Sequence, residues 1–169
     1  MKITSRLTRR EARNTVGVGA VVLALTGALV GAPAIASADP DPALLDLINQ
    51  QRAQAQPPCK PLTQNPQLQA AADREATDLA KPGTTFSHTG SDGSTIPQRI
   101  AATGYVFSQV AENIAQNDSD QGAVTAWMNS PGHKATMLNC AFTDAGTASS
   151  GQPGTDLHAF YVLDVAVPG

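Results

Sequence analysis

Hydrophobic residues recur at helical spacing in the part of the chain that follows residue 38. Leu44, Leu47 and Ile48 share one face of a helix predicted over residues 41–55, and polar residues occupy most of the other face. Asp41 precedes a proline, and this pair is typical of a helix start because the carboxylate caps free N–H groups. The pattern therefore predicts a first amphipathic helix with Asp41 as its N-cap.

The same start signal occurs at Asn65-Pro66 and predicts a second helix over residues 65–80. Its inward positions recur at helical spacing and are Leu68, Ala71, Ala72, Glu75 and Leu79. Lys81-Pro82-Gly83 ends the pattern, because proline and glycine both disfavour helix continuation. Two local helices thus precede the part of the chain that carries the polar motifs.

Shorter elements are predicted in the second half of the chain. A loop over residues 84–92 leads to a short helix that begins at Ser94 and ends at Gly104. A helix after residues 117–120 carries Trp127 on its apolar face, where a core role is expected. Strands are predicted over residues 105–114, 142–148 and 158–167, and the last has the strongest β composition.

The order of these elements indicates the fold class. Helices come before strands, and the segments between the predicted strands are too short for repeated parallel crossovers. We therefore predict an α+β fold in which helices pack on a small, mostly antiparallel sheet.

The first 38 residues have the pattern of an export signal. A basic segment precedes an uncharged run over residues 16–35, and Ala36-Ser37-Ala38 is a small-residue cleavage site. A membrane anchor is the alternative, but several glycines and the cleavage site disfavour it. We expect a cleaved signal peptide over residues 1–38, a single secreted domain over residues 39–169, and no membrane span after cleavage.

Cleavage would also change the net charge. The leader carries five of the 11 Lys and Arg and one of the 14 Asp and Glu, so the charge changes from −3 to near −7. A surface of this sign repels nucleic acid and anionic lipid headgroups. We therefore exclude nucleic acid as a partner.

The two cysteines, Cys59 and Cys140, both lie after the leader. Because exported proteins meet an oxidising environment, we predict that they form a disulfide. Such a bond closes a loop of about 80 residues and contributes at most about 4.5 kcal/mol in the chain-entropy view. Two buried free thiols are the alternative.

Three polar segments carry the candidate chemistry. His88 lies in the segment Phe86 to Asp92, Glu112 lies in 111–114, and His133 lies in 129–140. Ser130 and a following proline predict a short helix with His133 in its first turn. We predict that the three segments converge on one polar cavity.

These segments resemble those of the CAP superfamily, which comprises the cysteine-rich secretory proteins, antigen 5 and plant pathogenesis-related proteins. The resemblance rests on three motifs in order, namely Phe86-Ser-His-Thr-Gly-Ser-Asp-Gly93, Ala111-Glu-Asn-Ile-Ala115 and Ala126-Trp-Met-Asn-Ser-Pro-Gly-His133. It covers nearly all of residues 41–167. The leader and the cysteine positions are similar to the secreted actinobacterial branch, and to mycobacterial members in particular.

The resemblance implies an α-β-α sandwich with a central antiparallel sheet. It also implies an exposed cavity lined by two histidines and by acidic side chains, and His88, Glu112 and His133 match these positions. Many eukaryotic members place a glutamate a few residues after the first histidine. Asp92 is the nearest acid here, and its side chain is shorter.

Several chemistries fit such a residue set. His88 and His133, with Glu112 and Asp92 as further candidates, suit weak binding of Zn²⁺ or another divalent cation. A hydrogen-bonded structural cluster is the plainer alternative. A hydrolase would use Glu112 as base, with Ser87 or a metal-bound water as nucleophile.

We expect a secreted monomer, free or associated with the cell wall, that acts as a binding or interaction module for a lipid, a glycan or a peptide. A small apolar molecule or a peptide is the expected ligand. A metal-dependent or serine-type hydrolase that uses the same histidines and Glu112 is the alternative. His158 lies in the predicted last strand and is expected to be a partly exposed strand residue.

Overall fold

The computed structural model describes residues 39–151 and 159–169, so the predicted leader and His158 lie outside the described part. The elements follow one another along the chain in the order β1 (Asp39–Pro40), α1 (Pro42–Gln54), β2 (Thr63–Gln64), α2 (Pro66–Leu79), α3 (Ile96–Ala102), β3 (Phe107–Asn117), α4 (Asp120–Asn129), α5 (Pro131–Met137), β4 (Asp144–Ser150) and β5 (Ala159–Pro168). Across these two ranges, no helix is long and apolar enough to cross a membrane.

Polar caps begin the first two helices, as predicted. Asp41 Oδ1 accepts a hydrogen bond of 2.9 Å from the Leu44 amide at the start of α1. Asn65 Oδ1 accepts one of 2.9 Å from the Gln67 amide at the start of α2. The prediction for α3 is wrong by one residue: Thr95, not Ser94, is its N-cap.

The sheet has the order β1-β4-β5-β3, and each neighbouring pair in this path is antiparallel. The short strand β2 adds a parallel pairing with β4 at Thr63 and Gln64. The prediction of a mostly antiparallel sheet is therefore confirmed. The two-residue strands β1 and β2 were not predicted, because a segment of that length carries no alternation.

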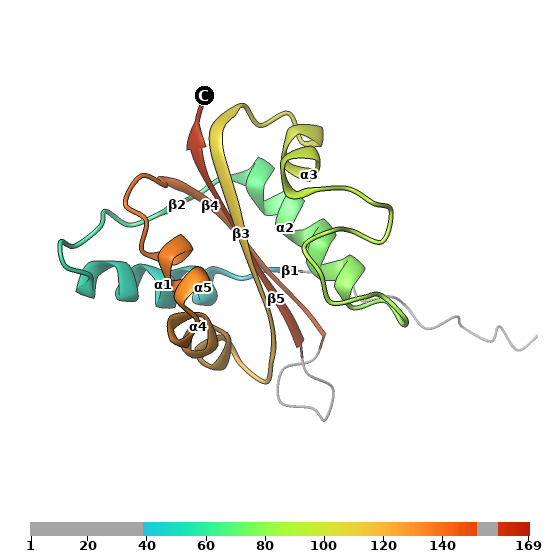
Figure 1. Cartoon of the computed structure of the whole chain (residues 1–169), viewed down its shortest axis with the longest axis horizontal. Helices are drawn as coiled ribbons and strands as arrows, with labels where there is room; N and C mark the ends of the chain where they lie inside the picture. Colours follow the sequence, from blue (N-terminus) through green and yellow to red (C-terminus); the bar gives the residue numbers. More distant parts are fainter. Residues whose placement is uncertain (1–38, 152–158) are drawn as a thin grey trace, which may run out of the picture. The chain divides into compact units, whose positions relative to one another are not determined.

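Helices cover both faces of the sheet, with α1, α4 and α5 on one side and α2 and α3 on the other (Figure 1). The strand β5 supplies both cores, because its side chains alternate between the faces. Tyr161, Leu163 and Val165 pack with α1, α4 and α5, whereas Val162 and Ala166 pack with α2 and α3. This arrangement confirms the α+β class and the three-layer sandwich.

The helix α2 lies directly on β4 because Gly146 has no side chain. A Cβ atom at Gly146 would lie 2.2 Å from the carbonyl carbon of Leu68, which belongs to the helix backbone. In the register of the sheet, Gly146 on β4 lies opposite Asp164 on β5, and Asp164 lies opposite Glu112 on β3. The close approach of α2 therefore buries the row that carries these two acids.

A buried arginine and the disulfide hold the cysteine loops on the α1 side. Arg52 is fully buried, and its guanidinium donates to the carbonyl oxygens of Lys60, Met137, Asn139 and Phe142. The predicted disulfide between Cys59 and Cys140 is present, with Cα atoms 4.9 Å apart. Trp127 is buried in the same core, which confirms its predicted role.

We predict that the variant Cys59→Ser/Cys140→Ser is less stable than the natural protein by as much as about 4.5 kcal/mol. The reason is that the bond restricts the unfolded chain across a sequence separation of 81 residues. Urea unfolding of both proteins without reductant measures the difference. A free energy of unfolding that is equal in the two proteins would contradict this account.

Candidate functional site

The candidate site is centred on a hydrogen bond between His88 and Glu112. His88 lies in the loop between α2 and α3, and its Nδ1 lies 2.8 Å from Glu112 Oε1 on β3. The Glu112 side chain is fully buried, whereas 45% of the His88 side chain is exposed. Glu112 thus fixes one edge of an imidazole whose other edge is open to solvent.

The same contact controls the charge on His88. The hydrogen bond to Glu112 raises the pKa of His88 above its ordinary value, and partial burial acts in the opposite direction. The protonated imidazole is therefore favoured beside the carboxylate, which makes the pair an ion pair in mildly acidic solution.

The buried side chain of Arg99 contacts the second oxygen of Glu112. Arg99 Nη2 donates to Glu112 Oε2 at 2.6 Å, and Arg99 Nε lies 3.1 Å from Glu75 Oε2 on α2. Arg99 Nη1 also donates to the carbonyl oxygens of His88, at 3.1 Å, and Ser94, at 3.0 Å. One guanidinium therefore fixes the carboxylate partner of His88 and also the backbone of the loop that carries His88.

Two further acids surround this arginine. Glu75 is only 1% exposed, and burial raises its pKa to about 7, although the charge of Arg99 opposes the rise. Asp164 lies opposite Glu112 in the sheet register. Burial raises the pKa of Asp164 well above its ordinary value, and the negative charge of Glu112 adds to the effect. We call Glu75, Arg99, Glu112 and Asp164 the Arg99 cluster.

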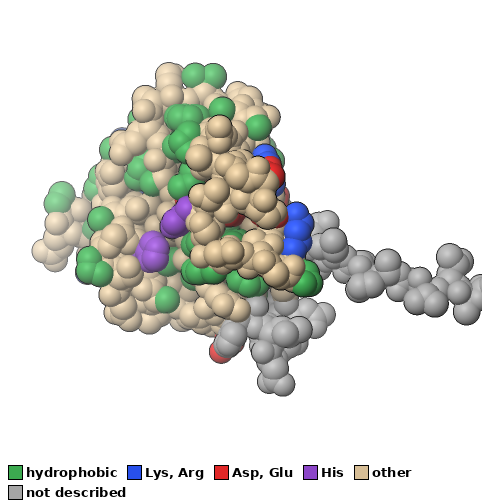
Figure 2. All heavy atoms as spheres, turned by 45° about the vertical axis from the view of Figure 1, so that its right-hand side comes forward, with side chains coloured by type: hydrophobic (Ala, Val, Ile, Leu, Met, Phe, Trp, Pro, Cys, Tyr) green, Lys and Arg blue, Asp and Glu red, His purple; other side chains and the backbone are tan. Residues whose placement is uncertain are grey.

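His133 lies in the opposite helical layer, and its convergence with His88 on one cavity stays a prediction. It lies in the first turn of α5, and its carbonyl oxygen accepts a hydrogen bond of 3.0 Å from Asn113 Nδ2. Burial lowers the pKa of His133, and the nearby charge of His88 adds to the decrease. Because Glu112 and Asn113 are neighbours on the edge strand β3, they anchor one histidine segment from each layer. The histidines of the described residues gather on one face (Figure 2).

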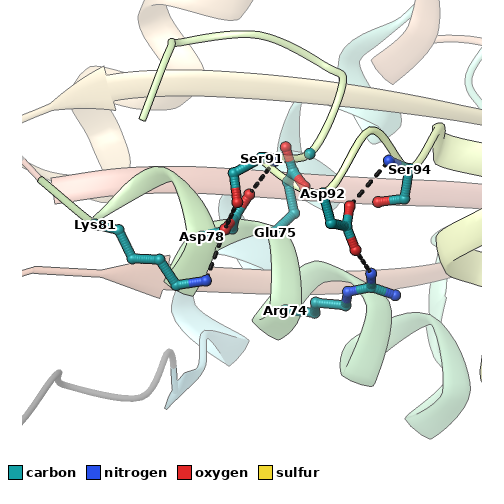
Figure 3. Close-up of a pocket in the computed structure, with 8 residues that line it drawn as sticks. Arg74, Glu75, Asp78, Lys81, Ser91, Asp92 and Ser94 are labelled. Atoms are coloured by element: carbon teal, nitrogen blue, oxygen red, sulfur yellow. Dashed lines mark hydrogen bonds and ion pairs between the residues drawn. The ribbon is translucent and has the colours of Figure 1, made fainter. Parts of the chain in front are cut away.

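Asp92, the predicted second acid, lies at a different place. Its carboxylate pairs with Arg74 on α2 and accepts a hydrogen bond of 2.9 Å from the Ser94 amide. The hydrogen bonds from Ser94 lower the pKa of Asp92 to about 2. These residues border a small pocket beside α2, with a volume of about 100 Å³, that is lined by Arg74, Glu75, Asp78, Lys81, Gly90, Ser91, Asp92 and Ser94 (Figure 3).

Glu112 and Asp92, the two acids among the expected metal ligands, are engaged by other side chains. Within residues 39–151 and 159–169, no group of three His, Cys, Asp or Glu side chains is arranged to hold a metal ion. Both oxygens of Glu112 are engaged, one by His88 and one by Arg99. The donor set therefore does not fit a closed metal site, and the predicted cation binding stays a prediction that depends on the two imidazoles.

Ser87, the expected nucleophile, contacts the backbone of its own loop. Ser87 Oγ accepts a hydrogen bond of 3.1 Å from the Thr89 amide, so it stabilises the turn of its own loop. This contact gives no support to a serine-type hydrolase.

Sequence reasoning missed Arg99, Glu75 and Asp164 as parts of the site. Glu75 interrupts the apolar face predicted for α2, and Asp164 interrupts the apolar run of β5. An acid at an inward position is costly unless it is paired, so these two interruptions were the available signal.

Comparison with known proteins gives a family match over most of the chain. Residues 45–165 match the model of the CAP family, described as the cysteine-rich secretory protein family. The match includes His88, Glu112 and His133, and it also includes all four residues of the Arg99 cluster.

Two solved structures are similar to this chain. An extracellular protein of Bacillus anthracis str. Ames that contains an SCP domain is 27% identical, with a TM-score of 0.63, and the match covers 74% of this chain and 39% of that protein. An outer surface protein of Borrelia burgdorferi is 25% identical, with a TM-score of 0.66, and the match covers 76% of this chain and 92% of that protein.

A curated relative matches over a shorter stretch. The uncharacterized membrane protein YlbC of Bacillus subtilis (strain 168) is 37% identical over 62 residues. These residues are 36% of this chain and only 18% of the relative. The chain therefore matches one part of a much longer protein.

We predict that the free energy of unfolding decreases as the pH rises from 5 to 8. Glu75 has its pKa raised from 4.5 to about 7, so the folded state binds its proton more tightly. The resulting stabilisation is complete below pH 4.5 and is lost as the pH rises through about 7, by about 1–3 kcal/mol. His88 and Asp164 shift in the same direction, and His133 opposes them. Urea unfolding at the two pH values measures the change.

Glu75→Gln is the variant for this measurement, because the amide does not titrate. It should reduce the pH dependence, although the part due to His88 and Asp164 remains. Asp46→Asn is the matched control, because it makes the same chemical change on an exposed position of α1. An equal dependence on pH in Glu75→Gln and in the natural protein would contradict the assignment.

Proposed function

Because this chain belongs to the cysteine-rich secretory protein family, we propose that it is a secreted binding module whose ligand contacts the surface around His88 and His133. The observation that carries the proposal is the 2.8 Å contact between His88 Nδ1 and Glu112 Oε1. It holds a half-exposed imidazole in a fixed orientation, and a preordered polar group loses little entropy when a ligand binds.

The partners of Glu112 favour binding over hydrolysis. A general base needs an oxygen within reach of the proton that it removes. In this site, His88 and Arg99 each engage one oxygen of Glu112, and the carboxylate is fully buried. These contacts support Glu112 as a residue that positions His88, rather than as a base that acts on a substrate.

Several observations support an extracellular location. The similar structures are an extracellular protein and an outer surface protein. The disulfide between Cys59 and Cys140 suits an oxidising compartment. The export pattern of residues 1–38 agrees with both, and its cleavage would leave residues 39–169 as the secreted domain.

The groups at the surface favour a peptide or a glycan as the ligand. Phe86 is 51% exposed, lies two residues before His88 and packs against Phe160 with ring centroids 6.2 Å apart. An exposed aromatic ring beside a polar group that is held in a fixed orientation is typical of such contact surfaces. The acidic charge of the domain disfavours anionic membranes.

We predict that His88→Ala/His133→Ala binds at least about tenfold more weakly than the natural protein to the members of peptide and glycan arrays that the natural protein retains. Loss of a polar contact of this kind costs about 1–2 kcal/mol. Val106→Ala is the control, because Val106 is 73% exposed and lies just before β3. Ligand cleavage by the natural protein that disappears in the double variant would instead favour the hydrolase.

We predict weak zinc binding that requires both histidines. Two imidazoles alone bind zinc less tightly than the three or four ligands of an ordinary site. Calorimetric titration of zinc into the natural protein and into His88→Ala/His133→Ala tests this expectation. Tight binding with a stoichiometry of one that persists in the double variant would contradict it.

A further inference from the structure

We propose that the small pocket beside α2 binds a primary ammonium group, such as that of a lysine side chain or an amino sugar. The pocket has a volume of about 100 Å³ and lies between α2 and the loop over residues 90–94. Three carboxylates line it, from Glu75, Asp78 and Asp92 (Figure 3). The pocket shares Glu75 with the Arg99 cluster, but the proposal does not depend on the function proposed for the surface around His88.

The first observation is a buried carboxylate oxygen that has no partner. Glu75 is 1% exposed, and its Oε1 accepts no hydrogen bond from the residues that the structure describes. Its Oε2 lies 3.1 Å from Arg99, but Arg99 also binds Glu112. A buried polar atom without a partner is costly, so a donor that enters the pocket would be stabilised there.

The second observation is the balance of charge. Lys81 neutralises Asp78 at 2.7 Å, and Arg74 neutralises Asp92. Arg99 is shared between Glu75 and Glu112, and Asp164 lies beside Glu112. Burial favours the protonated form of Asp164, so when the other acids are ionised, four carboxylates face three cations, and Glu75 and Glu112 share the single charge of Arg99. A positively charged ligand is therefore favoured over a neutral or negative one.

The geometry favours an ammonium group over a metal ion. In the described part of the chain, no three acidic, histidine or cysteine side chains are placed to surround a metal. An ammonium group has three N–H donors and needs hydrogen-bond acceptors, not a coordination shell. Glu75, Asp78, Asp92 and Ser94 line the pocket, and each carries oxygens of the kind that accept hydrogen bonds. The compact group fits a volume of about 100 Å³.

Gly90 keeps this space open. A Cβ atom at Gly90 would lie 2.7 Å from Ser94 Oγ and 2.9 Å from Asp92 Oδ1, both of which line the pocket. Gly90→Ala would therefore narrow the pocket without changing any charge. It complements Glu75→Gln, which removes the charge but also weakens the pairing of Arg99.

Methylammonium chloride is the first probe, titrated into the full chain at pH 8 while amide signals of Ser91 and Ser94 are followed by NMR. Tetramethylammonium chloride at equal ionic strength is the control, because it carries the same charge without N–H donors. We expect saturable shifts with methylammonium alone. We also expect affinity at least about tenfold lower in both Glu75→Gln and Gly90→Ala, since a charge-assisted hydrogen bond is lost or blocked. Asp46→Asn should bind as the natural protein does.

Lower pH should weaken the binding several-fold, because a proton on Glu75 competes with the ammonium group. The charged and titratable groups that face Glu75 are Arg99 on α3, Glu112 on β3, Asp164 on β5, Asp78 on α2 and His88 in the loop. The affinity for methylammonium measured at pH 5.5 is compared with the affinity measured at pH 8.

Nα-acetyl-lysine amide and glucosamine distinguish the source of the ammonium group, and the one that binds more tightly identifies it. Equal shifts with tetramethylammonium, no saturable shift with methylammonium, or full affinity in both Glu75→Gln and Gly90→Ala would each overturn the proposal.

Discussion

The buried guanidinium of Arg99 is the interaction on which the candidate site depends. It pairs with Glu75 on α2 and with Glu112 on β3, and it binds the carbonyl oxygen of His88. Removal of one partner from a buried pair costs about 3–5 kcal/mol, because the other charge is left unpaired in the interior. The cluster therefore joins α2, α3, the edge strand β3 and the loop that carries His88. The position of this loop depends on the contacts of Arg99.

The register of the sheet brings these charged side chains together. Side chains alternate along each strand, so Glu112 and Asp164 face the layer of α2 and α3, whereas Asn113 faces α5. Gly146 lets the backbone of α2 rest on the sheet, which removes water from the row of acids. Two histidine segments from opposite layers are consequently anchored at two successive residues of one strand. The site is a product of strand register and not of any local motif.

Local signals in the sequence were sufficient for much of the fold. Asp41 and Asn65 marked the starts of α1 and α2, and the β-rich composition near residues 158–167 marked β5. The histidines and Glu112 were identified from motifs, and the structure brings His88 and Glu112 into contact. The strand β2 could not be predicted, because it is two residues long and owes its conformation to pairing with β4.

The partners of Glu112 could not be predicted from local signals in the sequence. Arg99 lies 13 residues before Glu112 in the sequence, and Asp164 lies on a strand whose register fixes it opposite Glu112. Neither position has a spacing that marks it, because the contact arises only when the sheet and the α2–α3 loop close together. Asp92 was expected near His88 because both belong to one loop motif, but in the structure it pairs with Arg74 on α2. The closed fold therefore determines which base each acid meets: Arg74 pairs with Asp92, whereas Glu75 shares Arg99 with Glu112 beside the pocket.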